Sequence, residues 1–181
     1  MDAHVDFDYL RTMTEASDKK TIVVDLMTAY GEKVWNYAFS LTKKREQADD
    51  ITQEVFLKVY RNLFSFRSES SIKTWLFTIT RNTAHTYRRS AFFRKVTLVN
   101  YVESSETHKS AENEAMEKFG MRDIWEKVML LPLKYREVII LFGHDQLSMQ
   151  EISQVLGISE GTDKSRLHNA RLKLLKLKGG E

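Results

Sequence analysis

The sequence contains no cysteine and very little proline or glycine. Among its 181 residues there is one proline, and there are seven glycines. The lack of cysteine excludes a disulfide framework, a thiol redox switch and a cysteine-based zinc site within this chain. The residues that most often interrupt helices are scarce, and alternating runs of Val, Ile and Thr bounded by turn residues are few. We therefore predict an all-α fold.

The chain also lacks a strong excess of charge and any long apolar run. The formal net charge is +3 and the pI is about 9.0, so binding to a polyanion has to come from local basic patches. The first ten residues, MDAHVDFDYL, are acidic and lack the apolar run of a signal peptide. No stretch approaches a membrane span, so we expect a cytoplasmic protein that does not insert into lipid.

The most informative stretch is residues 147–178, which has the pattern of two helices joined by a glycine turn. Ser148 is placed to cap the first helix, Gly157 to end it in the left-handed conformation, and Ser159 to cap the second helix. The second helix has an inward seam and a basic remainder, which consist of Leu167, Ala170, Leu174 and Leu177, and of Lys164, Arg166, Arg171, Lys173, Lys176 and Lys178. A basic helix alone is most often a solvated face, but the two caps favour a DNA-binding helix-turn-helix.

Two amphipathic helices are predicted in the N-terminal half, over residues 21–43 and 48–66, after an arm (residues 1–20) without a strong period. On a helical wheel, the inward face of the second helix consists of Ala48, Ile51, Val55, Val59 and Leu63. The opposite face carries a mixed acidic and apolar stripe of Asp50, Gln53, Glu54, Leu57 and Arg61. A solvated face and a docking surface for a partner protein explain this stripe about equally well.

A third helix is predicted from about Ser71, with Ser70 or Ser71 as its cap. Its inward face consists of Ile72, Trp75, Leu76, Ile79, Thr83 and Tyr87, and its other face presents Thr74, Phe77, Thr78, Arg81, His85 and Arg88. Basic residues interleaved with aromatics suit single-stranded DNA, because bases stack on rings and phosphates meet arginines. The aromatic residues, Trp75 above all, suit a core equally well. His85 lacks partners at a metal-binding spacing, and we expect no metal and no cofactor.

Residues 97–112 separate two domains. They are acidic, contain serine and lack periodic apolar positions, which favours a soluble tether over a shield for the basic faces. The helical pattern returns after residue 113, and Pro132 fits the first turn of a further helix. Together with the helix-turn-helix, these helices predict a compact four-helix domain over residues 113–181, preceded by a helical domain over residues 21–96.

Four blocks resemble, in their order along the chain, the sigma factors of the extracytoplasmic-function group of the sigma-70 family. The blocks are ADDITQEVFLKVYRN, TWLFTITRNTAHTYRR, LPLKYREVIIL and LSMQEISQVLGISEGTDKSRLHNARLKL, and the resemblance spans roughly residues 22–178. It implies two helical domains, region 2 (21–96) and region 4 (113–181). It also implies a non-enzymatic protein that binds core RNA polymerase and directs it to promoters, under the control of a cognate anti-sigma factor that is often membrane-bound.

The resemblance further implies roles for single residues of region 2. The stripe of Asp50, Gln53 and Glu54, with Leu57 and Arg61, is expected to dock on the clamp helices of the polymerase β′ subunit, and the β subunit is a further expected partner. The non-template strand of the −10 element is expected to be held as it melts, with one base flipped, by Arg67, Ser68, Ser70, Lys73, Thr74, Phe77, Thr78, Arg81, His85 and Arg88.

In region 4 the second helix of the helix-turn-helix is expected to read the −35 element in the major groove. The wheel places five residues farthest from the seam, namely Thr162, Ser165, His168, Asn169 and Leu172. Of these, Ser165, His168 and Asn169 are candidates for base edges. Contacts to phosphate are assigned to Lys164, Arg166 and Lys173, and to the helix N-terminus at Gly161 and Thr162.

Three positions depart from the pattern of that family. Asp163 stands on the seam side where an apolar residue is usual, and a carboxylate fits poorly in a core although it gains from the helix dipole. Asn169 replaces an arginine, which shifts the expected base preference from guanine towards adenine. The turn at residues 143–145, Gly-His-Asp, is interpreted as a loop variation without functional consequence.

Two other functions compete with the promoter-specificity subunit. A stand-alone helix-turn-helix regulator needs a ligand-binding or dimerisation domain in place of residues 48–66, where the sequence instead has a docking stripe. A nucleic-acid enzyme finds no support, because there is no glycine-rich phosphate loop, no recognisable Ser/His/Asp arrangement and no carboxylate cluster with metal-like spacing.

Overall fold

The computed structural model describes residues 18–66, 69–97 and 122–178, with side chains up to residue 89 in the second range and from residue 124 to residue 177 in the third. Within these ranges it contains helices and no strand, which confirms the all-α class. Most of the N-terminal arm, most of the tether, and the candidates Arg67 and Ser68 lie outside the described residues.

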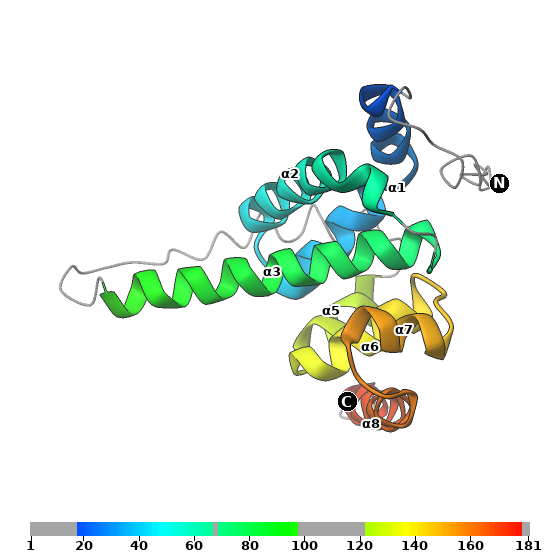
Figure 1. Ribbon diagram of the computed structural model, residues 1–181. Helices are drawn as coiled ribbons and strands as arrows, with labels where there is room; N and C mark the ends of the chain where they lie inside the picture. The colour runs from blue at the N-terminus through cyan, green and yellow to red at the C-terminus, as the bar shows by residue number, and fades with distance from the viewer. Residues whose placement is uncertain (1–17, 67–68, 98–121, 179–181) are drawn as a thin grey trace.

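The helices form two units (Figure 1). The N-terminal unit consists of α1 (Lys19–Thr42), α2 (Arg45–Asn62), the short 3-10 helix η2 (Leu63–Ser65) and α3 (Ile72–Thr97). The C-terminal unit consists of α5 (Arg122–Leu130), α6 (Leu133–Gly143), α7 (Met149–Leu156) and α8 (Glu160–Lys178). The last turns of α3 project beyond the body of the molecule (Figure 1).

Local signals in the sequence explain where several helices begin and end. Asp18 caps α1 by accepting a hydrogen bond from the amide of Lys20 at 3.0 Å. The helix stops where Lys43 adopts a left-handed φ of 60°. Ser71 accepts the amide hydrogen of Thr74 at 3.2 Å at the start of α3. Each of these ends therefore satisfies backbone groups that the helix itself leaves unpaired.

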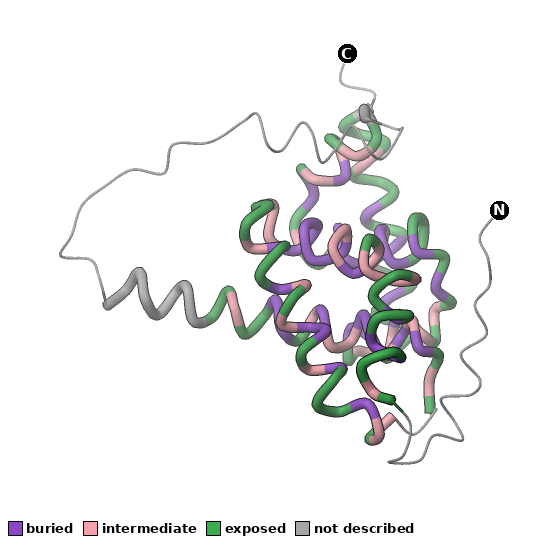
Figure 2. The backbone as a smooth tube through the Cα atoms, turned by 90° about the horizontal axis from the view of Figure 1, so that it is seen from above, coloured by how far each residue is buried: buried purple, intermediate pink, exposed green. Residues whose placement is uncertain are grey.

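The core of the N-terminal unit follows the predicted wheel. The inward positions of α2, Ala48, Ile51, Val55, Val59 and Leu63, are at most 3% exposed. They meet the apolar face of α1, including Leu26 and Val34, both fully buried. Figure 2 shows the buried residues gathered where the helices face one another, with exposed residues along the outer sides. The helical period alone therefore located this core.

The helix-turn-helix of the C-terminal unit also has its predicted caps. Ser148 and Glu151 form a reciprocal capping box, and Gly157 ends α7 with a φ of 62°. On α8, Leu167 and Ala170 are buried and Leu174 is half-buried, as the predicted seam requires. Leu177 is 40% exposed, so its assignment to the seam was wrong. It lies in the last turn of the helix, beyond the part that faces α6 and α7.

The two units are in direct contact. The strongest contact between them joins α3 to α7, and a second joins α1 to α6. At this boundary the ring of Tyr37 from α1 packs on that of Phe77 from α3, with centroids 5.2 Å apart. Both side chains are fully buried. The face of α3 that carries Phe77 is therefore an internal surface of the molecule.

Tyr37 provides a test of this boundary. Its buried hydroxyl has no hydrogen-bond partner among the described residues, and burial together with the nearby Glu137 raises its pKa well above the usual value. We predict that Tyr37→Phe raises the unfolding free energy by about 1 kcal/mol, because it removes an unsatisfied polar atom and keeps the ring. In the same urea titrations Tyr37→Ala should cost about 3–5 kcal/mol. A destabilised Tyr37→Phe variant would show that the hydroxyl has a partner.

Candidate functional site

The stripe on α2 lies on the surface, as the wheel predicted. Asp50, Gln53 and Arg61 are exposed and Glu54 is half-buried. Leu57 is 50% exposed, and Tyr60, which the sequence analysis did not single out, is 45% exposed. Two large apolar side chains three residues apart on one helix form a neighbouring pair. The acidic residues therefore border an apolar patch that is larger than the sequence indicated.

Two hydrogen bonds from this part of α2 reach α3. The hydroxyl of Tyr87 donates to Asp50 at 3.0 Å. Lys58 donates to the hydroxyl of Thr83 at 2.9 Å, and it lies 3.8 Å from the carboxylate of Glu54. Because both contacts cross between helices, they limit how far α2 can turn relative to α3. These contacts therefore hold α2, and the stripe on it, in a fixed position relative to α3.

The predicted single-strand face of α3 is covered by the C-terminal unit. At its start, the hydroxyls of Ser71 and Thr74 donate to one oxygen of Glu151, at 2.9 Å and 3.0 Å. The other oxygen of Glu151 accepts from the amide and the hydroxyl of Ser148. Burial by itself raises the pKa of Glu151, but these hydrogen bonds together hold it below its usual value. The carboxylate that caps α7 therefore also binds α3.

Further along α3, basic side chains meet acceptors of the C-terminal unit. Lys73 donates to the backbone carbonyl of Asp145. Arg81 donates from Nε to Glu137 at 3.0 Å, and the ring of His85 lies 3.8 Å from the same oxygen. Glu137 is 3% exposed, and an ion leaving water to this extent requires such partners.

The expectation that this face is open was therefore wrong. Thr74 is 1% exposed and donates to Glu151 of α7, and Phe77 is fully buried with its ring against that of Tyr37 from α1. The remaining described candidates on this face keep more contact with solvent. Ser70, Lys73, Thr78 and Arg81 are half-buried, and His85 and Arg88 are exposed.

Three residues of this covering surface were missed by the sequence analysis, namely Glu137, Asp145 and Glu151. Glu151 carried a signal, because a glutamate three residues after Ser148 completes a capping box. Asp145 belongs to the turn that was interpreted as a loop variation; its carbonyl accepts from Lys73, and the residue is 3% exposed. Glu137 carried no local signal, because its partner is 56 residues away in the chain.

The outward face of α8 is open, as predicted. Thr162, Ser165, His168 and Asn169 are exposed, and so are Gly161, Lys164 and Lys173, whereas Arg166 is half-buried. Leu172 is 45% exposed. Polar side chains on a single helix face, with cations beside them, provide donors and acceptors for base edges and phosphates.

A groove runs beside the N-terminal half of α8. Its volume is about 490 Å³, and it is lined by Lys134, Tyr135, Ser159, Gly161, Thr162, Ser165, Arg166 and Asn169. Five of these are predicted −35 residues, while Lys134 and Tyr135 come from the first turn of α6. Lys173 of α8 lies over the ring of Tyr135, 5.6 Å from its centroid. The sequence analysis missed both α6 residues, because only packing brings them beside α8.

The side chain of Asn169 is engaged in its own helix. Its amide nitrogen donates to the carbonyl of Ser165 at 2.9 Å. A bidentate contact to adenine uses the amide nitrogen and the amide oxygen together. Asn169 is exposed, so a change of rotamer suffices to release the nitrogen at the cost of this one hydrogen bond.

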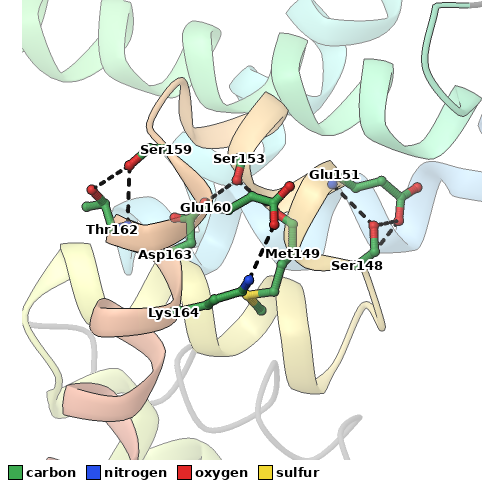
Figure 3. A network of polar contacts seen from close by, with 9 residues as sticks. All are labelled: Ser148, Met149, Glu151, Ser153, Ser159, Glu160, Thr162, Asp163 and Lys164. Atoms are coloured by element: carbon green, nitrogen blue, oxygen red, sulfur yellow. Dashed lines mark hydrogen bonds and ion pairs between the residues drawn. The ribbon is translucent and has the colours of Figure 1, made fainter.

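Asp163 is held inside the helix-turn-helix (Figure 3). It is fully buried, and one of its oxygens accepts a hydrogen bond from Ser153 of α7 at 2.8 Å. The hydroxyl of Ser153 also lies 2.8 Å from the carbonyl of Met149. The carboxylate that fits poorly in an apolar seam therefore joins α7 to α8 through a polar contact.

Burial raises the pKa of Asp163, against the hydrogen bond from Ser153 and the nearby Arg166. A serine hydroxyl has a single proton and can donate to one of its two acceptors at a time. The hydroxyl of Ser153 is therefore shared between the carboxylate of Asp163 and the carbonyl of Met149.

The described residues contain no group of three or more His, Asp or Glu side chains suited to a metal ion. None of the described helices is long and apolar enough to cross a membrane. The candidate surfaces in these ranges are the stripe on α2, the face of α3 that carries Thr74 and Arg81, and the groove at α8.

Comparisons with known proteins match both units. Residues 26–92 match the family model for sigma-70 region 2, and residues 121–174 match that for sigma-70 region 4. The sigma factor YlaC of Bacillus subtilis is 32% identical over 156 residues, which are 85% of this chain and 90% of that protein. The sigma-E factor of the extracytoplasmic-function group from Haemophilus influenzae is 30% identical, over 87% of each chain.

Solved structures agree with this match. The sigma factor RpoE of Bartonella quintana, in complex with the anti-sigma factor NepR, is 28% identical and aligns with a TM-score of 0.68 over 90% of this chain and 99% of that chain. CnrH, in complex with the cytosolic domain of CnrY, shares the fold at 22% identity, with a TM-score of 0.68 over 96% of this chain and 97% of that one.

The contact between Ser153 and Asp163 predicts a pH dependence. A carboxyl whose pKa is raised by folding stabilises the folded state below the usual aspartate pKa of about 3.9, and this contribution is lost as the pH rises through the raised value. Asparagine does not titrate, so we expect Asp163→Asn to lack this pH-dependent loss. In urea titrations the unfolding free energy of the variant, compared with that of wild type, should therefore be more favourable at neutral pH than at acid pH. Parallel pH profiles would contradict the expectation.

A matched variant changes Ser153, the other partner in the same contact. At neutral pH Ser153→Ala should cost about 1–3 kcal/mol, because it leaves the buried carboxyl without its hydrogen bond.

Proposed function

The chain belongs to the extracytoplasmic-function group of sigma-70 sigma factors, and we propose that each of its three candidate surfaces has a separate role in promoter recognition. As a sigma factor it binds core RNA polymerase and directs transcription initiation to promoters. The sigma factors are not a family of enzymes. We propose that this chain has no catalysis of its own and that it works in the cytoplasm.

The groove beside α8 is the observation that best supports reading of duplex DNA. An exposed helix with polar residues on its outer face fits a major groove, and the cations at its border fit the phosphates on either side. Lys134 extends the basic border to α6, and Tyr135 adds a hydroxyl of the kind that contacts phosphate. We assign Ser165, His168 and Asn169 to base edges of the −35 element. Lys134, Lys164, Arg166 and Lys173 are assigned to its phosphates.

The stripe on α2 is proposed to dock on the β′ clamp helices of core polymerase. Interfaces gain most of their affinity from a few buried apolar or aromatic anchors with a polar border. Leu57 and Tyr60 supply such anchors, and Asp50 and Glu54 supply the border. The hydrogen bonds to α3 keep this helix in place before the partner binds, which lowers the entropy lost on docking.

The face of α3 is proposed to hold the melted −10 strand. Lys73 and Arg81 provide cations for phosphates, Ser71 and Thr74 provide hydroxyls, and Phe77 provides a ring on which a base can stack. All five residues are at or under the contact with the C-terminal unit, so this role requires that contact to open.

A stand-alone helix-turn-helix regulator was the alternative. The match to region 2 over residues 26–92 supports the sigma factor instead. The similar structure from Bartonella quintana is a sigma factor bound to an anti-sigma factor. We propose that this chain likewise has a cognate anti-sigma factor, which in many such systems is membrane-bound.

Transcription in vitro tests the docking surface and the function together. Adding the protein to core polymerase on genomic DNA should give new promoter-specific transcripts. The double variant Glu54→Ala with Leu57→Ala should bind core polymerase at least about tenfold more weakly, a loss of about 1.4 kcal/mol, and give fewer transcripts. Glu32→Ala, an exposed acidic residue of α1, is the control and should behave as wild type. No new transcripts from wild type would refute the function.

The groove makes a separate prediction about duplex DNA. Asn169→Ala should reduce discrimination at one base pair of the −35 element by about 1–3 kcal/mol. Lys173→Ala should instead weaken binding to all sequences about equally and lower the salt slope by about 1. Both are measurable by fluorescence anisotropy with duplexes that differ at single positions. The opposite pattern would mean that the assignment of base and phosphate contacts on α8 is reversed.

A further inference from the structure

Ser153 joins three parts of the helix-turn-helix at one residue. Its carbonyl accepts the amide hydrogens of Gly157 and Ile158 in the turn, at 2.8 Å and 3.3 Å. Its hydroxyl lies 2.8 Å from the carbonyl of Met149 in α7 and 2.8 Å from the carboxylate of Asp163 in α8 (Figure 3). The body of α7, the turn and the first helical turn of α8 are therefore all attached to this residue.

Asp163 makes its contact with Ser153 in a site that is closed to water. The residue is fully buried, and its second carboxylate oxygen, Oδ1, has no hydrogen-bond partner among the described residues. Burying a carboxylate without a hydrogen bond costs free energy. Any movement of α8 that breaks the bond to Ser153 leaves both oxygens of the carboxylate unsatisfied. The contact therefore opposes displacement of α8 relative to α7.

The apolar contacts of α8 constrain its rotation less than this hydrogen bond does. Leu167 and Ala170 are buried on the same side of the helix as Asp163, but the hydrophobic effect that stabilises them is non-directional. A hydrogen bond weakens steeply as its angle departs from linearity. The bond between Ser153 and Asp163 thus defines the rotation of α8 about its own axis, at the N-terminal end of the helix.

The three residues assigned to base edges lie on the other side of α8 from Asp163. Ser165, His168 and Asn169 follow it by two, five and six residues in the chain and are exposed. At about 100° per residue, they lie roughly 120–160° from Asp163 around the helix. Because a helix rotates as one body, any rotation at Asp163 moves all three side chains and changes the angles of their hydrogen bonds to base edges.

We infer that Asp163, through its hydrogen bond with Ser153, is a positioning residue for reading of the −35 element. The inference rests on the proposed role of α8 in reading duplex DNA. The bond holds the helix at the one rotation at which its outer residues meet base edges together. Without the bond, α8 adopts several rotations, and sequence discrimination falls while phosphate contacts, which carry no direct sequence information, persist.

Asp163→Val tests the bond separately from stability. Valine fills the site without a polar group, and Ser153 keeps the carbonyl of Met149 as its acceptor, so the variant should be at least as stable as wild type in urea. Its preference for the duplex that wild type binds best, over singly substituted duplexes, should fall at least about fivefold, which corresponds to a weak base contact. Asp163→Asn keeps an oxygen acceptor for Ser153 and should retain the preference.

Ser153→Ala removes the same bond from its other partner and should lose the preference to a similar extent. Ser40→Ala is the matched control, because the buried hydroxyl of Ser40 also donates to a backbone carbonyl, that of Tyr37 at 2.6 Å, but within α1. It should lower stability and leave the preference unchanged. The double variant Ser153→Ala with Asp163→Val should lose no more preference than either single variant, since both substitutions remove one contact.

Fluorescence anisotropy of the full chain at one salt concentration separates the outcomes. Affinity for singly substituted duplexes should be similar in all variants, because it comes mainly from phosphates. A wild type without any preference among duplexes would refute the proposed role of α8. A wild-type preference that Asp163→Val and Ser153→Ala both retain would refute the positioning role alone. A loss in Asp163→Asn equal to that in Asp163→Val, or a loss in Ser40→Ala equal to that in Ser153→Ala, would also overturn it.

Discussion

A carboxylate that leaves water must find a cation and hydrogen-bond donors, and Glu137 finds them across the boundary between the two helical units. Its pairing with Arg81 at 3.0 Å joins α6 to α3, and the fully buried rings of Tyr37 and Phe77 lie at the same boundary. The pair helps to define the register of this boundary, since without Arg81 the buried carboxylate of Glu137 would keep only the ring of His85, 3.8 Å away. The relative position of α3 and α6 therefore depends in part on this charge being neutralised.

Much of the fold followed from the helical period and from capping residues. The inward positions predicted for α2 are all buried, although the wheel missed Phe56, and Ser148 with Gly157 marked both ends of α7, because these signals act over three or four residues. The outward residues of α8 were predicted for the same reason. The seam assignment failed at Leu177, where the helix has no neighbour to bury it.

The contacts between the units could not be predicted, because they depend on pairs of residues far apart in the chain. Phe77 has the spacing of an outward residue on α3, but its ring packs on that of Tyr37 from α1. Lys134 and Tyr135 reach the groove only through the packing of α6 on α8. Asp163 was recognised as unusual from its position, but its partner Ser153 depends on how α7 and α8 cross. A helical wheel separates the buried face of one helix from its solvent-exposed face. It carries no information on contacts with a second helix, and these residues make such contacts.

The open groove at α8 and the covered face of α3 also have a consequence in time. If the proposed roles hold, duplex DNA reaches the exposed residues of α8 without any change in the arrangement of the two units. An unpaired strand reaches the buried hydroxyl of Thr74 only after α7 moves away from it. The two steps of promoter binding would then differ in the structural change that each requires.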